Sequence, residues 1–202
     1  MRFHFYAIKL SGIMILIFVL QLLIPGFTDF FVLNGDAWSQ PWRFLSAVFL
    51  HGGAGHLLYN LFALALFGSI LEKLIGGKKF VVVFFITGIL ANLVSINFYD
   101  SSLGASGAIF GVIGALIFVR PLQVVWAFGL PMPIFIAGVL WAFGDVIGIF
   151  IPDNVGNIAH LSGMFFGLVL GALYKKRKRR RANPKFVIDE GSVRSWERGW
   201  IG

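Results

Sequence analysis

The chain contains no cysteine and few charged residues. Only 13% of its 202 residues are charged and 58% are hydrophobic, whereas a soluble domain is about a quarter charged and about half apolar. The absence of cysteine excludes disulfide bonds and thiolate metal sites. The shortage of charge excludes a soluble domain of ordinary composition. The excess of apolar residues therefore indicates a membrane protein.

Six apolar runs are candidates for membrane-spanning helices, since a span needs roughly 20 mostly apolar residues. The expected spans are about 7–25, 54–72, 79–97, 105–119, 124–149 and 157–174. The first run lacks a small-residue cleavage site and is followed by five more, so we interpret it as a retained span rather than a signal peptide. We therefore expect an all-α membrane protein, a bundle of six transmembrane helices. The aromatic-rich connection 26–53 is expected to be a structured loop lying partly in the membrane interface.

The basic residues favour one orientation of the chain. Ten of the 17 lie in the last 28 positions, beginning with the run 175–181. Directly after a hydrophobic span, such a run is typical of a cytoplasmic anchor that meets anionic lipid, and we prefer this interpretation to nucleic-acid binding. The chain then divides into a membrane domain, 1–174, and a basic cytoplasmic tail, 175–202.

Six spans satisfy the positive-inside rule in every loop. With the tail in the cytoplasm, the inner side receives Arg2, Lys9, Lys73, Lys78, Lys79 and Arg120. The outer side receives Asp29, Asp36, Asp100 and Asp153, with Arg43 as its one basic residue. We therefore predict a multi-pass protein of the plasma (inner) membrane with both termini in the cytoplasm.

A polar fragment, Gly104-Ala-Ser106-Gly107, opens the fourth apolar run. The glycines allow a tight entry into a helix and a close approach of the backbone. A serine at a helix start lies beside free backbone N–H groups, which can receive an oxyanion. An N-cap serine is a common structural alternative, so Ser106 alone does not indicate catalysis.

His160 makes a catalytic role for Ser106 more plausible, because a histidine inside an apolar span needs a partner or a function. Glycines follow His160 at positions 163, 167 and 171 and follow Ser106 at 107, 111 and 114. Each set forms a small-residue stripe on one helix face, so the two helices are expected to pack closely. This contact would bring a serine nucleophile and its base together at the outer end of the bundle.

Two further polar residues are expected at the same depth. His56 and Asn60 are four residues apart, share one face of the second span and can donate hydrogen bonds to an oxyanion. His51 points elsewhere around that helix and is assigned a structural role. A zinc site of His51, His56 and His160 ranks low, since it lacks an obvious carboxylate or cysteine. Asp145 is a candidate to orient His160, but the sequence does not place it there.

At these residues the chain resembles the rhomboid family of intramembrane serine proteases. The matching segments are Trp42-Arg43, His51–Asn60, Gly104–Gly111 and Ala159–Gly167, in the family's order. The resemblance covers about 1–174 and implies a rhomboid-like bundle of six spans. It implies that Ser106 is the nucleophile and His160 the base of a dyad, with no acid required, no metal and no cofactor. It also implies that the Ser106 N–H, His56 and Asn60 form the oxyanion hole.

The resemblance further implies cleavage of single-pass transmembrane proteins near the extracytoplasmic end of their helix. Phe110 matches an aromatic position that packs near the catalytic histidine and is Tyr in some members, so no loss of activity is expected from the missing hydroxyl.

The alternative is a rhomboid-like pseudoprotease that binds membrane proteins without cutting them; that class usually lacks the serine or the histidine. A small transporter that uses the histidine and aspartate as a proton relay is a third reading, but the chain shows no internal repeat of the kind many transporters have.

Overall fold

The computed structural model describes residues 4–151 and 155–175, with 191, 194–195 and 199 from the C-terminal segment. The predicted basic tail therefore lies almost wholly outside the described residues. The helices are α1 Tyr6–Leu23, α2 Phe27–Phe31, α3 Arg43–Ser46, α4 Ala54–Ala63, α5 Ser69–Ile75, α6 Gly77–Ser95, α7 Ser106–Val119, α8 Ile134–Gly148 and α9 Asn157–Tyr174. The 3₁₀ segments are η1 Gly35–Trp38 and η2 Ala47–Phe49, and η3 Leu64–Gly68 is a π-helical segment. The strands are β1 Leu33–Asn34, β2 Ser101–Ser102, β3 Val124–Ala127 and β4 Leu130–Pro133.

Among the described residues, four helices are long and apolar enough to cross a membrane. They are Tyr6–Leu23, Ala54–Ile75 (α4, η3 and α5 in one helix), Gly77–Ser95 and Asn157–Tyr174. These agree with four predicted spans to within three residues, the largest difference being 72 against Ile75. The helices α7 and α8 are apolar but shorter, at 14 and 15 residues. The mostly helical membrane fold is as expected, and the count of six spans stays a prediction.

The predicted span 124–149 is wrong in its first part. Residues 124–133 form an antiparallel hairpin of β3 and β4, and α8 begins only at Ile134. The turn residues Phe128 and Gly129 both have positive φ, at 54° and 76°, which is the backbone of a two-residue hairpin turn. Val125 and Ala127 face the core while Val124 and Trp126 are exposed. Within this apolar run, buried and exposed residues alternate as they do in a β-strand.

The connection 26–53 is folded, as predicted. It contains α2, β1, η1, α3 and η2, and Arg43 at its centre is only 5% exposed. The Arg43 guanidinium donates hydrogen bonds to the carbonyl oxygens of Asp29 and Val32, both at 2.8 Å. These bonds satisfy backbone acceptors that a loop would otherwise leave unpaired.

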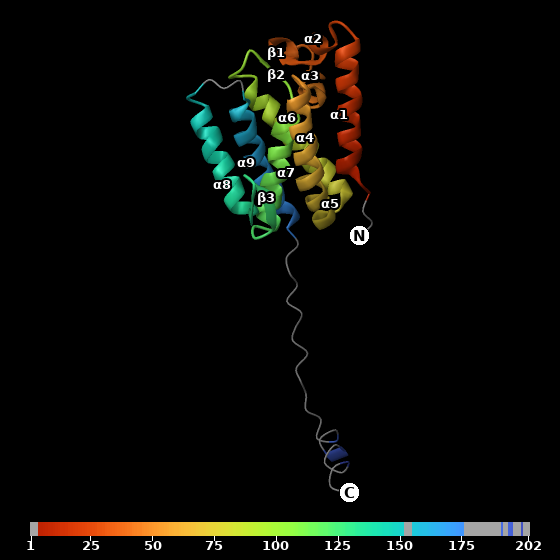
Figure 1. Ribbon diagram of the computed structural model, residues 1–202, viewed down its shortest axis with the longest axis vertical. Helices are drawn as coiled ribbons and strands as arrows, with labels where there is room; N and C mark the ends of the chain where they lie inside the picture. Colours follow the sequence, from red (N-terminus) through yellow and green to blue (C-terminus); the bar gives the residue numbers. More distant parts are fainter. Residues whose placement is uncertain (1–3, 152–154, 176–190, 192–193, 196–198, 200–202) are drawn as a thin grey trace.

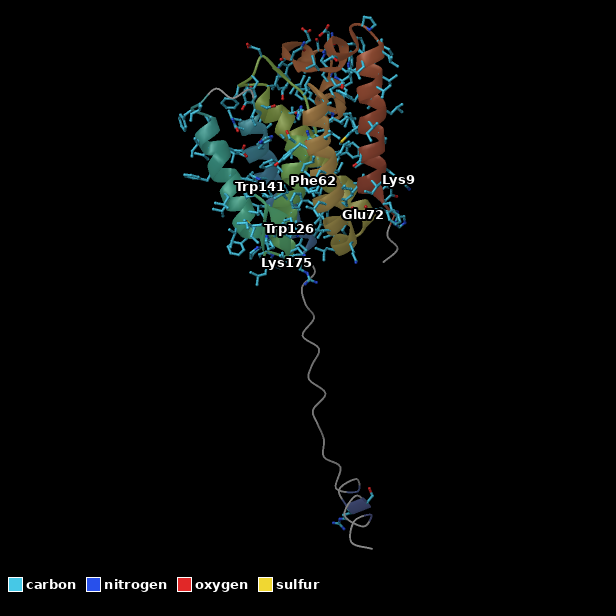
Figure 2. All side chains as sticks on the ribbon, in the orientation of Figure 1. Lys9, Phe62, Glu72, Trp126, Trp141 and Lys175 are labelled. Atoms are coloured by element: carbon cyan, nitrogen blue, oxygen red, sulfur yellow. The ribbon has the colours of Figure 1, made fainter. Side chains whose placement is uncertain are left out.

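The helices stand side by side in one bundle, with β1 and β2 at its upper end and the β3–β4 hairpin at its lower end (Figure 1). Trp126 and Lys175 also lie at the lower end (Figure 2). The pair β1–β2 ties the connection 26–53 to the segment just before α7, with Leu33 opposite Ser102. A hydrogen bond from Gly104 N to the Ala47 carbonyl continues this tie. The connection 26–53 therefore holds the segment that leads into α7 at two points.

The start of α1 is held by a side chain from another helix. Glu72 of α5 is 1% exposed, and its carboxylate accepts hydrogen bonds from the backbone N–H groups of His4 and Ala7. A carboxylate at a helix N-terminus pairs with free donors and with the positive end of the helix dipole. These two hydrogen bonds explain how the Glu72 carboxylate can be almost fully buried.

Candidate active site

A cavity of about 1310 Å³ opens among α4, α7, α8 and α9. It lies toward the upper end of the bundle, where α4, α7 and α9 begin (Figure 1). Four of its lining residues are the side chains singled out from the sequence: His56, Asn60, Ser106 and His160. The cavity therefore brings together polar groups from three separate helices.

Ser106 is the first residue of α7, and Gly104 shapes the approach to it. Gly104 has φ of +125°, a conformation that L side chains rarely adopt. A Cβ there would lie 2.8 Å from the His56 ring and 3.9 Å from the Ser106 hydroxyl oxygen. Only glycine leaves room for His56 beside Ser106. The first N–H groups of α7 have no partner within the helix, so they are free to face an oxygen bound there.

The helices α7 and α9 make the close contact that the glycine stripes predicted. A Cβ on Gly163 would strike the Gly107 carbonyl, and one on Gly167 would strike the Gly111 carbonyl. Further along, a Cβ on Gly171 would lie 2.8 Å from the Ala115 carbonyl oxygen. Backbone meets backbone along the contact, as small-residue faces allow in membrane helices. Ser106 and His160 extend from the upper part of this contact into one cavity.

The His160 ring is fixed by two neighbours. Its face stacks on Phe110 with the ring centroids 4.2 Å apart and the planes 5° from parallel. Its Nδ1 lies 2.9 Å from the Asp145 carboxylate oxygen Oδ1. The predicted packing of Phe110 near the histidine is confirmed. The sequence did not place Asp145, and the structure shows that its carboxylate contacts the His160 ring.

The hydroxyl of Ser106 and the ring of His160 are both described, and no direct hydrogen bond within 3.5 Å joins them. Such bonds are often long in the absence of substrate and shorten when it binds. The structure thus places the two groups in a common cavity.

His56 and Asn60 line the cavity from α4. The Gly52 N–H donates to His56 Nδ1 at 3.4 Å, which leaves Nε2 as the ring nitrogen that carries a proton. Asn60 is 2% exposed, and one of its amide hydrogens is donated to the His56 carbonyl at 2.9 Å. The amide has a second hydrogen. Both residues can therefore offer a donor to an oxygen in the cavity.

His51 does not line the cavity. It is 2% exposed, and its ring meets the His56 ring edge to face at 5.1 Å. Burial, with a smaller contribution from His56, lowers the pKa of His51 to about 4, so the ring is neutral at neutral pH. Within the described part of the chain, no group of three or more His, Cys, Asp or Glu is placed to hold a metal ion. The arrangement agrees with the structural role expected of His51.

Trp141 is a site residue that the sequence analysis missed. It lies one helical turn before Asp145 on α8 and lines the cavity. Its ring contacts Phe67 edge to face at 5.6 Å and Phe110 at 6.4 Å. The i, i+4 spacing of Trp141 and Asp145 was the available signal, because such residues share one helix face.

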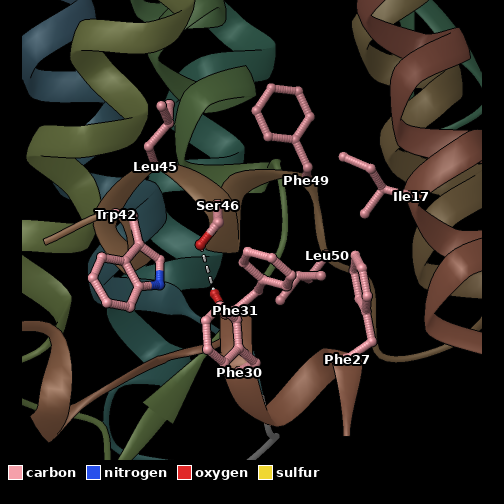
Figure 3. Close-up of a pocket in the computed structure, with 9 residues that line it drawn as sticks. All are labelled: Ile17, Phe27, Phe30, Phe31, Trp42, Leu45, Ser46, Phe49 and Leu50. Atoms are coloured by element: carbon pink, nitrogen blue, oxygen red, sulfur yellow. Dashed lines mark hydrogen bonds between the residues drawn. The ribbon is translucent and has the colours of Figure 1, made fainter. Parts of the chain in front are cut away.

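A second cavity, of about 490 Å³, lies between α1 and the connection 26–53. Its lining is aromatic and aliphatic, and the one polar side chain, Ser46, donates its hydroxyl hydrogen to the Phe31 carbonyl (Figure 3). It offers neither a nucleophile free to react nor a base. The larger cavity is therefore the candidate active site.

Comparison with known proteins points to one family. The family model of the rhomboid domain matches residues 38–177. "Rhomboid protease GlpG" of Haemophilus influenzae is 30% identical over 180 residues, which cover 84% of this chain and 91% of that protein. "Putative rhomboid protease YdcA" of Bacillus subtilis is 34% identical over 163 residues, which cover 73% of this chain and 74% of that protein.

Plant proteins are also similar to this chain. "RHOMBOID-like protein 7" of Arabidopsis thaliana is 32% identical over 156 residues, which cover 76% of this chain but 47% of the plant protein. The chain thus spans less than half the length of this longer relative.

Proposed function

We propose that this chain, which belongs to the rhomboid family, is an intramembrane serine endopeptidase that cuts transmembrane helices of other proteins. The chain is an integral membrane protein by family and by its apolar helices. The observation that carries the proposal is the single cavity lined by Ser106, His160, His56 and Asn60. A hydroxyl, an imidazole and two donors on three helices are the parts that acyl transfer needs.

The proposed reaction begins at Ser106. Its oxygen attacks the scissile carbonyl carbon while its proton passes to Nε2 of His160. The tetrahedral oxyanion then accepts hydrogen bonds from the Ser106 N–H, His56 Nε2–H and the Asn60 amide. Collapse of this intermediate breaks the peptide C–N bond, and His160 returns the proton to the leaving amine. Water, activated by the same base, hydrolyses the acyl-enzyme.

A substrate helix is proposed to enter from the side, between α4 and α8. The ring contact between Phe67 of η3 and Trp141 of α8 closes this side of the cavity. Peptide groups unpaired in lipid are costly, so a helix unwinds more readily once its end reaches the polar cavity. Single-pass transmembrane proteins with small or helix-breaking residues near that end are the proposed substrates.

The proposed topology has six spans, with both termini in the cytoplasm of a plasma (inner) membrane and residues 175–202 meeting anionic lipid. The helices α7 and α8, at 14 and 15 residues, are the short spans of this topology, and both adjoin the cavity. In the proposed topology Ser106, the first residue of α7, is recessed below the outer surface. A serine recessed in this way is open to water through the cavity and near the extracytoplasmic end of a substrate helix. This depth supports cleavage near that end.

The test is cleavage of a single-span reporter by the purified full chain in detergent. Ser106→Ala and His160→Ala are expected to abolish cleavage, and a fluorophosphonate is expected to label Ser106. Ser162→Ala is the matched control, because Ser162 is also on a membrane helix but its hydroxyl is bound to the Ile158 carbonyl at 2.7 Å. Cleavage by Ser106→Ala at the wild-type rate would remove the protease proposal.

The oxyanion assignment has its own test. Asn60→Ala is expected to lower kcat by about 10²–10³-fold, the usual effect of losing one oxyanion donor, with KM little changed. A rise in KM at constant kcat would instead make Asn60 a binding residue.

The competing function is that of a pseudoprotease, which would bind membrane proteins without cutting them. The presence of both Ser106 and His160 in one cavity argues against it. Reporter that is captured but stays uncut, with no fluorophosphonate labelling, would favour this alternative.

A further inference from the structure

We propose that Asp145 is a positioning residue for His160, so that the reaction is run by a Ser–His–Asp arrangement rather than by a dyad alone. The proposal rests on the proposed protease function and adds a residue to it. Asp145 is 7% exposed on α8, and its Oδ1 lies 2.9 Å from Nδ1 of His160. A buried carboxylate without a function is rare in a membrane helix.

The contact decides which nitrogen of His160 carries the proton. An ionised carboxylate can only accept a hydrogen bond, so Nδ1 of the neutral ring must be the donor. Nε2 is then left without a proton, and it is the nitrogen available to the cavity and to Ser106. Asp145 therefore selects the tautomer that a general base requires.

The contact also fixes the direction of the ring. Stacking on Phe110 sets the plane of the imidazole, with the two rings 5° from parallel. Stacking alone is compatible with two orientations of the ring, related by a half-turn about the Cβ–Cγ bond that exchanges its two edges. The bond to Asp145 stops this rotation and holds Nε2 toward the cavity. The two contacts from α7 and α8 thus complete the orientation of a side chain on α9.

Asp145 is placed to act more strongly in the transition state than in the resting enzyme. When His160 takes the serine proton it becomes a cation next to the carboxylate, in surroundings that screen charge poorly. The second carboxylate oxygen, Oδ2, is buried and has no hydrogen-bond partner among the described residues. Among the described residues, no donor at Oδ2 therefore competes with the imidazolium for this carboxylate. Interactions that strengthen on the way to the transition state raise kcat.

A purely structural role is the alternative. The bond between Asp145 and His160 also ties α8 to α9, and a tie of this kind could matter only for stability. The two helices have another contact nearby, because Gly148 of α8 packs directly against the Asn157 side chain. The tie is therefore not the sole link between these helices, and removing it need not separate them.

Two substitutions at Asp145 separate the roles. Asp145→Ala removes both charge and bond, while Asp145→Asn keeps a hydrogen-bonding side chain of the same shape without the charge. We expect both to lower kcat about 10²-fold, at the low end of a general base's contribution, with KM within about twofold of wild type. We expect Asp145→Asn to keep the wild-type unfolding temperature in detergent. The Asn amide can donate to Nδ1 and so stabilises the wrong tautomer.

The experiment measures kcat, KM, the rate of fluorophosphonate labelling of Ser106 and the unfolding temperature of the full chain. Ser11→Ala is the control for loss of a buried polar group, since the buried Ser11 hydroxyl donates to the Ala7 carbonyl of its own helix, α1, at 3.0 Å. It is expected to keep wild-type kcat. Slower labelling in both Asp145 variants, without a change in KM, supports the proposal.

Three outcomes are distinguishable. Wild-type kcat in Asp145→Asn overturns the positioning role, whatever happens to Asp145→Ala, and leaves Asp145 as a structural tie. If Asp145→Ala fails to fold, Asp145→Asn alone decides. Absence of cleavage and of labelling by the wild-type chain refutes the protease function itself, and no Asp145 variant can produce that result.

Discussion

The contact between α7 and α9 and the attachment of α8 are built in opposite ways. Along α7 and α9, glycines let one backbone touch the other, and a Cβ on Gly114, Gly163 or Gly167 would strike a backbone carbonyl of the other helix. On α8, only Ile134, Ala137, Gly138 and Asp145 are buried, and a Cβ on Gly144 would meet nothing within 4 Å. The proposed nucleophile and base lie on the tight contact. Trp141, whose ring is proposed to close the cavity, lies on the loose helix.

This difference matches two demands on the site. A nucleophile and its base must hold their geometry, since a shift of about 1 Å can cost about 10²-fold in rate. An entrance must move to admit a substrate. In the proposed mechanism the glycine contact meets the first demand, and the sparse packing of α8 meets the second. Asp145 belongs to both regions, because it lies on the loosely packed α8 and contacts His160 on the tightly packed α9.

The strongest test of this difference is to make the same Gly→Ala substitution in both regions. Gly163→Ala should destabilise the protein by about 1–3 kcal/mol through overpacking and lower kcat by about 10²-fold, because α9 must move away from the Gly107 carbonyl. Gly144→Ala should leave kcat unchanged and raise stability by up to about 1 kcal/mol, since alanine is the better helix former. Thermal unfolding and reporter cleavage in detergent measure both.

Equal effects of the two glycine substitutions would contradict the division into tight and loose regions. Loss of stability in Gly163→Ala without loss of kcat would show that the packing of α7 on α9 does not position the chemistry.

A smaller effect on the cleavage rate is expected from a change at Trp141, whose ring joins α8 to the rest of the site. Trp141→Ala removes its ring contacts with Phe67, Phe110 and Phe128. An aromatic pair contributes about 0.5–1.5 kcal/mol, so the open state should become about two- to tenfold more populated. Cleavage of a reporter embedded in liposomes should speed up accordingly, and cleavage of a short water-soluble peptide should not.

Phe143→Ala is the control for Trp141→Ala, because Phe143 is an exposed aromatic residue on the same helix. It should leave both rates unchanged. Slower cleavage of the embedded reporter by Trp141→Ala would mean that the ring binds substrate rather than closing the entrance.

The smallest effect is expected inside the tight region. Phe110→Tyr keeps the ring that stacks on His160 and adds only a hydroxyl. The cavity adjoins Phe110, so the hydroxyl has room, and kcat should stay within about twofold of wild type by the usual size of a tolerated change. A loss beyond that range in the reporter assay would show that the stack is more tightly fitted than the cavity suggests.

The tight region was largely predictable from the sequence and the loose one was not. Glycines at a spacing of three to four residues mark one face of a helix, and two such faces predicted the contact that joins the Ser106 and His160 helices. The spacing of His56 and Asn60 likewise predicted a shared face. In these cases the pattern itself carries the geometry, because small residues and polar residues stand out in an apolar helix.

The helix α8 carries no such pattern. Its residues are apolar on nearly every side, so the sequence does not say which face turns toward α9 or whether Asp145 meets His160. Its start was also misplaced, because a run of apolar residues can be strand or helix. Pro131 and Pro133 in β4, with Phe128-Gly129 at the turn, were the signs against a helix there.

The carboxylate of Glu72 has a consequence for how this protein is made. The N–H groups of His4 and Ala7 find their partner 68 and 65 residues further along the chain. A ribosome produces α1 well before it produces α5, so the beginning of α1 waits in the membrane with open donors until α5 arrives. The pairing that completes the start of α1 is therefore formed late in biogenesis, and water or lipid headgroups can satisfy these donors in the interval.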